Sequence, residues 1–476
     1  MIKFFVNLNP GRLQNRGLWL IVAAFLLAGL IYFQLQLPVN AGTNPPVGST
    51  AKTNATKNKT PVVIKQVFDN GLILLIKPNS ANEVVSVQAL IRMGAIYEPQ
   101  SKRGISKLLQ QVLLKGTATR DAKGIVLETE SVGASIDAGL ADSGYGSVSL
   151  KTTLAGLERS LPVFLDIIQN PSFPPREVAK EKQLMLQQLT AMNDRPATAA
   201  YLNFSNLFYS GYPVGMKPEE IAQKVRLLTR DDLVAWYQKT YIPNNMVVSI
   251  VGNVDPQQIS KIIQDVFGGW PKGNEPVVTS AIVPSFDEDR QIIKTRDSQA
   301  LFMILGYPAP DIFSEDYPAM KVIGYILGGD MGSRLFVELR DKKGLAYNVN
   351  TDYYPSNYPS NIYAFIATAP ENYRSAREGI IAEFKRLTTE QVLPEELNSA
   401  KQALKGSFLM GHETNANQGR YLGSFELLGL GYQYDQAYLE VIDKVTAADI
   451  QRVARKYFTH YVLSVITPAA VKEEAN

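Results

Sequence analysis

Short apolar runs and longer helical patterns alternate along the chain from residue 61 onward. Val84–Leu90 is a run of apolar and β-branched residues typical of a buried strand, and Ser147–Thr152 is expected to be another strand. Between Leu157 and Ile168, apolar residues recur at helical spacing, which predicts a helix. Asn170-Pro171 is expected to end that helix.

The same order of elements occurs twice, with a period near 220 residues. Residues 175–183 are echoed by residues 394–402, and residues 228–233 by residues 445–450. In each half, a tyrosine and an apolar strand follow the second of these segments. We therefore expect two homologous α+β domains that arose by duplication. The repeat alone says nothing about chemistry.

The repeat also suggests where the domains begin and end. We place the first domain at residues 61–272 and the second at residues 291–470. Residues 273–290, which contain Pro276 and Pro284, have the composition of a linker. A chain of 476 residues is long enough for two such domains.

The N-terminus has the pattern of a targeting segment. Lys3, Arg12 and Arg16 precede an uncharged stretch whose most apolar part is residues 18–33. That part is short for a spanning helix, which needs about 20 residues, and long for the apolar region of a signal peptide. Residues 1–41 are therefore either a cleaved signal peptide or a single membrane anchor. Both place the main body on the non-cytoplasmic side of a membrane, in the periplasm or its equivalent.

A polar segment, residues 42–60, follows the targeting segment. It is rich in Thr, Asn, Lys, Pro and Gly and nearly free of large apolar side chains. Such a segment cannot bury enough apolar surface to order itself, so we expect a flexible linker.

Composition narrows the classes of function. The net charge is only +3 and no long basic run interrupts the chain, so nothing indicates nucleic-acid binding. Cysteine is absent, which excludes disulfides, thiolate metal sites and a cysteine nucleophile. Histidine occurs only as His412 and His460.

Several segments, taken in order, are similar to the pitrilysin/insulinase family of zinc peptidases. The first half carries Gly94–Glu98 and Leu114–Thr117, and the second half carries Gly328–Phe336 and Gly344–Tyr347. The resemblance extends from residue 66 to residue 468, and it rests on the order and spacing of the segments more than on any one of them.

The resemblance implies a fold of two related α+β domains, each a mixed β-sheet faced by helices, with a pseudo-two-fold relation between them. In the family, two such two-domain units face each other across an enclosed cavity. The units belong to one polypeptide in one branch and to separate chains in another. At 476 residues, this chain corresponds to one unit.

The residues that would hold zinc are missing. In the family, His-x-x-Glu-His on a helix supplies two zinc ligands and a base, and a later glutamate completes the site. The matching positions are Lys107, Gln110, Gln111 and Gln188. Lysine is protonated near neutral pH and repels a dication, and glutamine carbonyls bind zinc poorly. We expect no cofactor and no hydrolysis from this chain alone, and zinc in a partner subunit.

Glu181 stands where the family often has an auxiliary glutamate. It is either a retained part of the site or an ordinary carboxylate on a helix surface. Lys107 is a candidate ion-pair partner that would fill the space of the lost ion.

Arg340 and Tyr347 match the arginine–tyrosine pair that the family's second unit points into the cavity. In two-chain members this pair comes from the subunit without zinc. A guanidinium and a phenol can donate hydrogen bonds to a substrate carbonyl and to the oxyanion that forms from it. The alternative is that both are ordinary core or surface residues, but the matches that flank them favour function.

Two further features have a functional and an ordinary interpretation. Gly328, Gly329 and Gly332 form either a loop that contacts substrate, as in the family's non-catalytic subunits, or a tight turn between helices. They are not a phosphate loop, because the Gly-Lys-Ser/Thr ending is missing. His412-Glu413 resembles an acid–base pair but is more typical of a solvated helix face.

Three functions follow from these observations. The leading one is a non-catalytic subunit that pairs with a related chain carrying the zinc motif and supplies half of a peptide-enclosing cavity. The second is a structural or peptide-binding scaffold derived from a peptidase, without a proteolytic role. The third, an autonomous zinc metallopeptidase, requires ligands that the sequence does not supply.

Overall fold

The computed structural model describes four stretches of the chain, residues 62–141, 144–278, 286–358 and 360–468. All of them belong to one compact unit, residues 59–476. The predicted targeting segment, the predicted flexible linker at residues 42–60 and part of the linker predicted at residues 273–290 lie outside the described residues. Within the described ranges, no helix is both long and apolar enough to cross a membrane.

The first half builds a six-stranded mixed sheet from its described residues. Strand β3 pairs antiparallel with β5 and β6, while β2 runs parallel to β6. Because β3 and β6 are central, nearly all their side chains are buried, which explains their continuous apolar sequences. In spatial order the strands are β1 (Ile64–Val67), β2 (Ile73–Pro78), β6 (Met246–Gly252), β3 (Val84–Arg92), β5 (Tyr145–Thr153) and β4 (Ser135–Ala141).

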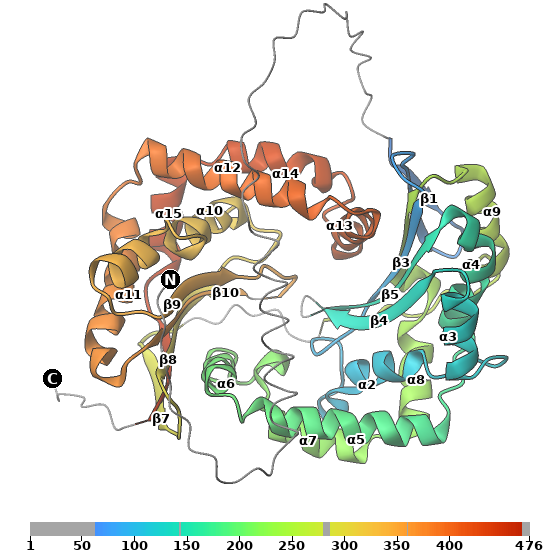
Figure 1. Cartoon of the computed structure of the whole chain (residues 1–476), viewed down its shortest axis with the longest axis horizontal. Helices are drawn as coiled ribbons and strands as arrows, with labels where there is room; N and C mark the ends of the chain where they lie inside the picture. The colour runs from blue at the N-terminus through green and yellow to red at the C-terminus, as the bar shows by residue number, and fades with distance from the viewer. Residues whose placement is uncertain (1–61, 142–143, 279–285, 359, 469–476) are drawn as a thin grey trace, which may run out of the picture. The chain divides into compact units, whose positions relative to one another are not determined.

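Helices cover one face of this sheet, and their apolar sides form its core (Figure 1). The helix predicted at residues 157–168 is confirmed inside α4, which ends one residue before Asn170. The helices of this half are α2 (Ile105–Leu113), α3 (Ala122–Glu130), α4 (Leu154–Gln169), α5 (Pro175–Met192), α6 (Pro196–Phe208), α7 (Pro218–Leu227), α8 (Arg230–Thr240) and α9 (Pro256–Phe267).

The second half builds a five-stranded sheet from the residues described there. Its order is β7 (Arg290–Thr295), β11 (Val462–Thr467), β8 (Leu301–Ala309), β10 (Ser360–Thr368) and β9 (Asn348–Tyr353). Its helices are α10 (Tyr317–Gly328), a π-helical segment (Phe336–Lys342), α11 (Tyr373–Thr389), α12 (Pro394–Gly411), α13 (Asn415–Leu428), α14 (Tyr434–Asp443) and α15 (Ala447–Tyr457).

The predicted duplication is visible in the topology. The order β2-β6-β3-β5-β4 in the first sheet matches β7-β11-β8-β10-β9 in the second, and the first pair of each is parallel. The echoed sequence segments make equivalent contacts. Lys182 Nζ donates to the Arg226 carbonyl at 2.7 Å, and Lys401 Nζ donates to the Asp443 carbonyl at 2.8 Å. Thr229 and Thr446 each begin a helix with a capping box.

One helix from each half packs on the sheet of the other half. Helix α13 lies on the face of β3 and β6 that the first half's own helices leave open, and Ser249 Oγ donates to the Gly419 carbonyl at 2.6 Å (Figure 1). Helix α6 lies on β8 and β11, where Phe204 fills the space that the missing side chain of Gly306 leaves. Each sheet therefore buries its second face only because the other half supplies a helix.

Candidate functional site

The side chains of Gln111 and Gln188, two of the positions that the resemblance assigns to the zinc site, are in contact. Gln111 Nε2 on α2 lies 3.4 Å from Gln188 Oε1 on α5. The two helices pack against each other, with Leu108, Leu109 and Met185 in the same core. Two of the four predicted positions are thus brought into contact.

Buried polar groups fix the start of α2, the helix that carries three of the four positions. The Glu98 carboxylate accepts the Gly104 N–H at 2.8 Å and the Ser106 N–H at 2.9 Å. Trp236 Nε1 donates to Ser106 Oγ at 3.0 Å, which ties α8 to the same turn. Burial raises the pKa of Glu98, although the hydrogen bonds from this turn act in the opposite direction.

Gln110 points into the core and away from the Gln111–Gln188 contact. It is 2% exposed, and its Nε2 donates to the Tyr241 hydroxyl at 2.9 Å. Gly146 leaves room for this side chain, because a Cβ there would lie 2.3 Å from Gln110 Nε2. The family's base is therefore replaced by a neutral amide that bonds a buried phenol and cannot take a proton from water.

The predicted pairing of Lys107 with Glu181 is wrong. Glu181 Oε1 lies 3.1 Å from Lys115 Nζ, one helical turn beyond Gln111. The Lys107 side chain is exposed and joins no ion pair among the residues that the structure describes. Glu181 is only 8% exposed, so it is not an ordinary surface carboxylate. Its burial requires a cation, and Lys115 supplies it.

These donors do not fit zinc. The contact offers two neutral amides, and the third ligand position carries an exposed ammonium. Zinc sites are built from thiolate, imidazole and carboxylate, and an ammonium has no lone pair to give. In the described part of the chain, no three His, Cys, Asp or Glu side chains gather as a metal site would require.

Arg340 and Tyr347 lie on either side of a tight turn in the second half. Arg340 is on the π-helical segment, and its guanidinium stacks over the Phe336 ring at 4.5 Å. Gly344, with φ of +62°, turns the chain and donates to the Arg340 carbonyl at 3.0 Å. Tyr347 follows directly, with its N–H bonded to Ala367 at 2.9 Å and its side chain 70% exposed. Hydrogen bonds fix the backbone of this turn, while both polar side chains face outward.

The glycine-rich segment is explained largely by packing. A Cβ on Gly328 would lie 2.3 Å from the backbone nitrogen of Thr351, so glycine lets α10 approach β9. A Cβ on Gly329 would lie 2.5 Å from the Tyr325 ring. A Cβ on Gly332 would meet only the Asp330 carboxylate within 4 Å, and Met331 beside it is 74% exposed. The turn interpretation is favoured for the first two glycines, while Gly332 stays a candidate for substrate contact.

His412 does not lie on a solvated face, contrary to the prediction for His412-Glu413. Its side chain is 14% exposed and its Nε2 lies 2.6 Å from Asp435 Oδ1. Glu413 is exposed. The pair is therefore split between the interior and the solvent.

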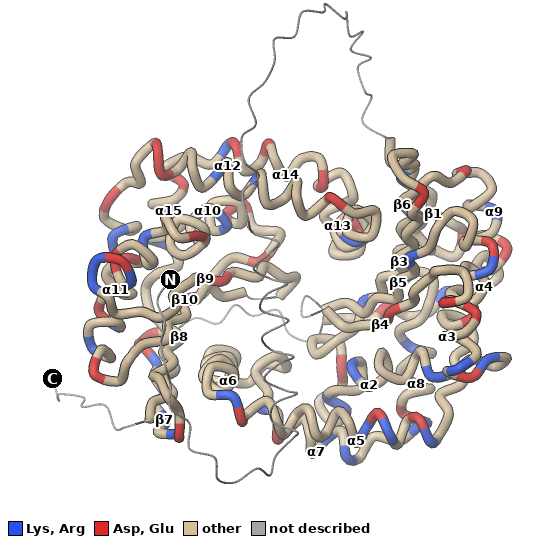
Figure 2. Tube along the Cα trace, in the orientation of Figure 1, with Lys and Arg blue, Asp and Glu red and all other residues tan. Residues whose placement is uncertain are grey.

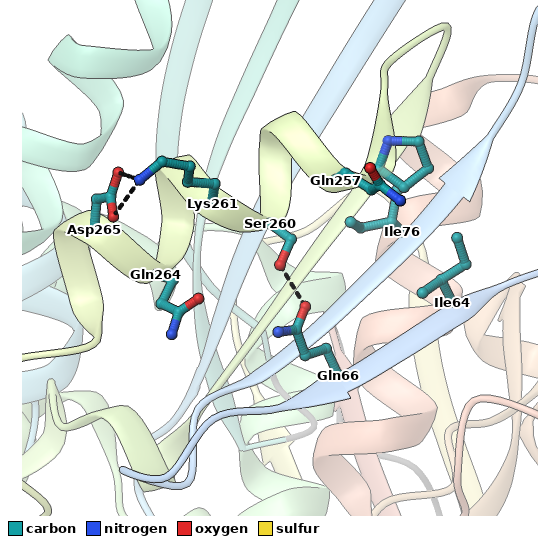
Figure 3. Close-up of a pocket in the computed structure, with 9 residues that line it drawn as sticks. Ile64, Gln66, Ile76, Gln257, Ser260, Lys261, Gln264 and Asp265 are labelled. Atoms are coloured by element: carbon teal, nitrogen blue, oxygen red, sulfur yellow. Dashed lines mark hydrogen bonds and ion pairs between the residues drawn. The ribbon is translucent and has the colours of Figure 1, made fainter.

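A groove of about 800 Å³ lies elsewhere, between β1, β2 and α9 (Figure 3). Ser260 and Gln66 bond across it, and Lys261 pairs with Asp265 at 2.8 Å along α9. None of the predicted site residues lines this groove. Around the rest of the surface, Lys and Arg alternate with Asp and Glu along outer helices such as α5 and α11 (Figure 2).

Sequence reasoning missed three contacts of the candidate sites, those of Lys115, Tyr241 and Phe336. Lys115 carries a signal, because it stands four residues after Gln111 and so on the same side of the helical path. Phe336 and Arg340 have the same spacing. Tyr241 is separated from Gln110 by 131 residues, and no local pattern indicates that they meet.

Two family profiles match the chain in succession. The profile described as insulinase (peptidase family M16) matches residues 74–218, and the profile described as peptidase M16 inactive domain matches residues 227–404. An uncharacterized zinc protease of Rickettsia bellii is 28% identical over 401 residues, covering 83% of this chain and 95% of its own length. The uncharacterized zinc protease YmxG of Bacillus subtilis is 25% identical over 415 residues, covering 86% and 99%.

Solved structures share the fold. A peptidase M16 inactive domain from Pseudomonas fluorescens aligns with a TM-score of 0.79 at 22% identity, covering 87% of this chain and 100% of that one. A protease from Helicobacter pylori also aligns at 0.79, with 21% identity and coverage of 86% and 100%. The duplicated topology, the motifs in both halves and these matches agree. The chain therefore belongs to the insulinase family of peptidases, family M16.

Proposed function

We propose that the chain is the non-catalytic partner subunit of a zinc-dependent peptidase. It would form half of a peptide-enclosing cavity and supply Arg340 and Tyr347 to the substrate in trans. The observation that carries the proposal is the Gln111–Gln188 contact at 3.4 Å. Helices α2 and α5 pack together there, and the amide side chains that meet between them are poor metal ligands and cannot act as a base toward a metal-bound water.

Arg340 and Tyr347 are suited to act on a substrate bound by another chain. Each side chain carries a hydrogen-bond donor and extends from a backbone that hydrogen bonds fix in place. Tyr347 is 70% exposed. Such donors stabilise the negative charge that forms on a carbonyl oxygen during attack. Phe336 limits the directions that the Arg340 guanidinium can take, which supports a positioned donor more than a mobile surface charge.

The partner would be a related chain with an intact His-x-x-Glu-His motif, and zinc would belong to that chain. The substrate would be a peptide. The N-terminal residues 1–41 would carry the body across a membrane or hold it there, on the non-cytoplasmic side.

Two other functions differ in what they require of this chain. The name zinc protease that the relatives carry would suggest an autonomous metallopeptidase, but the amides at positions 110, 111 and 188 oppose it. A scaffold without a proteolytic role requires nothing of Arg340 and Tyr347. Their exposure on a rigid turn favours the subunit proposal over the scaffold.

Peptide hydrolysis by three samples tests the proposal: this chain alone, a zinc-motif partner alone and their equimolar mixture, each with and without a chelator. Chelator-sensitive activity confined to the mixture is the expected result. A partner that is fully active alone and indifferent to this chain would instead favour the scaffold. Hydrolysis by this chain alone would contradict both.

A further inference from the structure

A histidine and an aspartate that the proposed function does not use join three helices in the second half. His412 ends α12, Asp435 lies in the first turn of α14, and the His412 ring stacks on Tyr421 of α13 at 4.3 Å and 9°. Asp435 is 8% exposed. We propose that this pair is a protonation-dependent latch that holds α13, the helix linking the two halves, in its place on the first sheet.

Both nitrogens of the His412 ring face acceptors. Nδ1 lies 2.7 Å from the Phe408 carbonyl, and Nε2 lies 2.6 Å from Asp435 Oδ1. A carbonyl oxygen and a carboxylate have no hydrogen to give, so both bonds form only when both nitrogens carry hydrogen. The ring that makes both contacts is therefore the imidazolium. The site at the carboxyl end of α12 suits a cation, because that end of a helix carries partial negative charge.

The charged and titratable groups around the ring come from each packed element. On α12 the neighbouring Glu413 is exposed. Helix α13 contributes Tyr421, with the Arg420 guanidinium over its ring at 4.7 Å, and α14 contributes Tyr438 as well as Asp435. Strand β2 contributes Lys77, whose pKa is lowered by burial and held up in part by Asp435. Asp435 is therefore in contact with His412 and has the charge of Lys77 nearby, and loss of the His412 proton leaves Lys77 as the cation of this group.

The latch acts on α13 through direct contacts. Gln418 Nε2 donates to the His412 carbonyl at 2.8 Å, and the Tyr421 ring covers the imidazole. On its opposite side α13 holds the first sheet, where Asn415 Nδ2 donates to the Val84 carbonyl at 2.6 Å. Deprotonation removes one of the two ring bonds and leaves a buried carboxylate with one fewer charged donor. This weakens the packing of α12 and α14 around α13.

Hydrogen exchange of α13 measures how firmly the latch holds this helix. Because the chain contains only two histidines, the protonation state of the His412 ring can be followed separately. In the full chain, ¹⁵N shifts of the His412 ring give its protonation state. Exchange of residues 415–428, corrected for intrinsic rates, gives the opening of the helix over pH 5.5 to 8.5. We expect about a tenfold rise in opening over the pH interval in which His412 loses its proton, equivalent to about 1.4 kcal/mol.

Two variants complete the test. His412→Gln should show high opening at every pH, whereas His460→Gln, at an exposed pair 3.5 Å from Asp289, should keep the wild-type dependence. Two results would overturn the proposal. One is protection of α13 that does not change across the pH range, and the other is a wild-type dependence of protection on pH in His412→Gln. If His412→Gln fails to fold, the protonation state of the His412 ring in the wild-type chain is the deciding measurement. A His412 ring with only one protonated nitrogen at pH 6, while both contacts persist, contradicts the latch.

Discussion

Gln111 and Gln188 are 77 residues apart in the chain, yet their side chains meet at 3.4 Å, Nε2 to Oε1, across two packed helices. This contact supports the proposal that α2 and α5 keep the arrangement of a family metal site and that only the ligand side chains have changed. On that proposal, restoring the side chains should restore the site.

The fourfold variant Lys107→His, Gln110→Glu, Gln111→His and Gln188→Glu is expected to bind zinc. It restores two imidazoles one helical turn apart on α2 and a carboxylate on α5 where Gln188 now meets Gln111. Metal analysis after demetallation and reconstitution should give one zinc per chain. The wild-type chain should give none.

The matched control keeps Gln188 and changes only the three positions of α2. Without the third ligand, affinity should fall by more than about 100-fold, since even changes outside the ligand shell cost 10–100-fold. Gln110→Glu alone should bind no zinc. Equal affinity of the threefold and fourfold variants would show that position 188 does not face the metal.

Gly328→Ala should destabilise the second half by about 1–3 kcal/mol, because its Cβ would lie 2.3 Å from the Thr351 backbone nitrogen. The control is Gly406→Ala on α12, where a Cβ meets no atom within 4 Å and helix propensity favours alanine by about 1 kcal/mol. Urea unfolding of the two variants should therefore move in opposite directions. Equal stabilities would remove the packing explanation of Gly328.

Acid should weaken the fold partly through Asp316, whose side chain is 4% exposed and bonds Arg452 at 2.5 Å and Lys456 at 2.6 Å. Burial raises the pKa of Asp316, but the two cations outweigh it and the pKa lies below its usual value. Because the folded-state pKa is the lower one, these bonds stabilise fully above the unfolded value, about 3.9, and the contribution is lost as pH falls through the folded-state pKa.

Asp316→Asn should therefore cost about 1–3 kcal/mol at pH 7 and less at pH 2, measured by urea unfolding at both values. Asp231→Asn, at a side chain 95% exposed, is the control and should change stability little at either pH. A cost for Asp316→Asn that is the same at pH 2 and pH 7 would contradict the role given to its charge.

Much of the fold could be predicted from local patterns. The strand predicted at residues 84–90 is confirmed in β3 and the strand at 147–152 in β5. The echoed segments 228–233 and 445–450 both contain the start of a helix with a capping box. These elements depend on side-chain periodicity and on turn residues, both of which are local. The exchange of α6 and α13 between the sheets was not predicted, because an apolar helix face does not say which sheet will cover it.

The candidate site shows the same division. The four replaced positions are found by motif spacing, but the orientation of Gln110 toward Tyr241 depends on packing between residues 131 apart. The partner of Glu181 and the burial of His412 were predicted wrongly for a similar reason. Lys115 lies two residues past the end of α2 and pairs with Glu181 in place of Lys107, and the acceptor of His412 Nε2 lies 23 residues downstream on another helix.

The kcat/KM of the mixed complex with Tyr347→Phe in this chain tests the central claim most directly. Tyr354→Phe is the control. Tyr354 lies in the same half and is 69% exposed, against 70% for Tyr347, and each substitution removes one phenolic hydroxyl. If this chain supplies a donor to the reacting carbonyl in trans, Tyr347→Phe should lower kcat/KM by about 100-fold or more while Tyr354→Phe stays within about twofold. Equal activity of both variants and the wild-type mixture would contradict the claim that the chain takes part in catalysis.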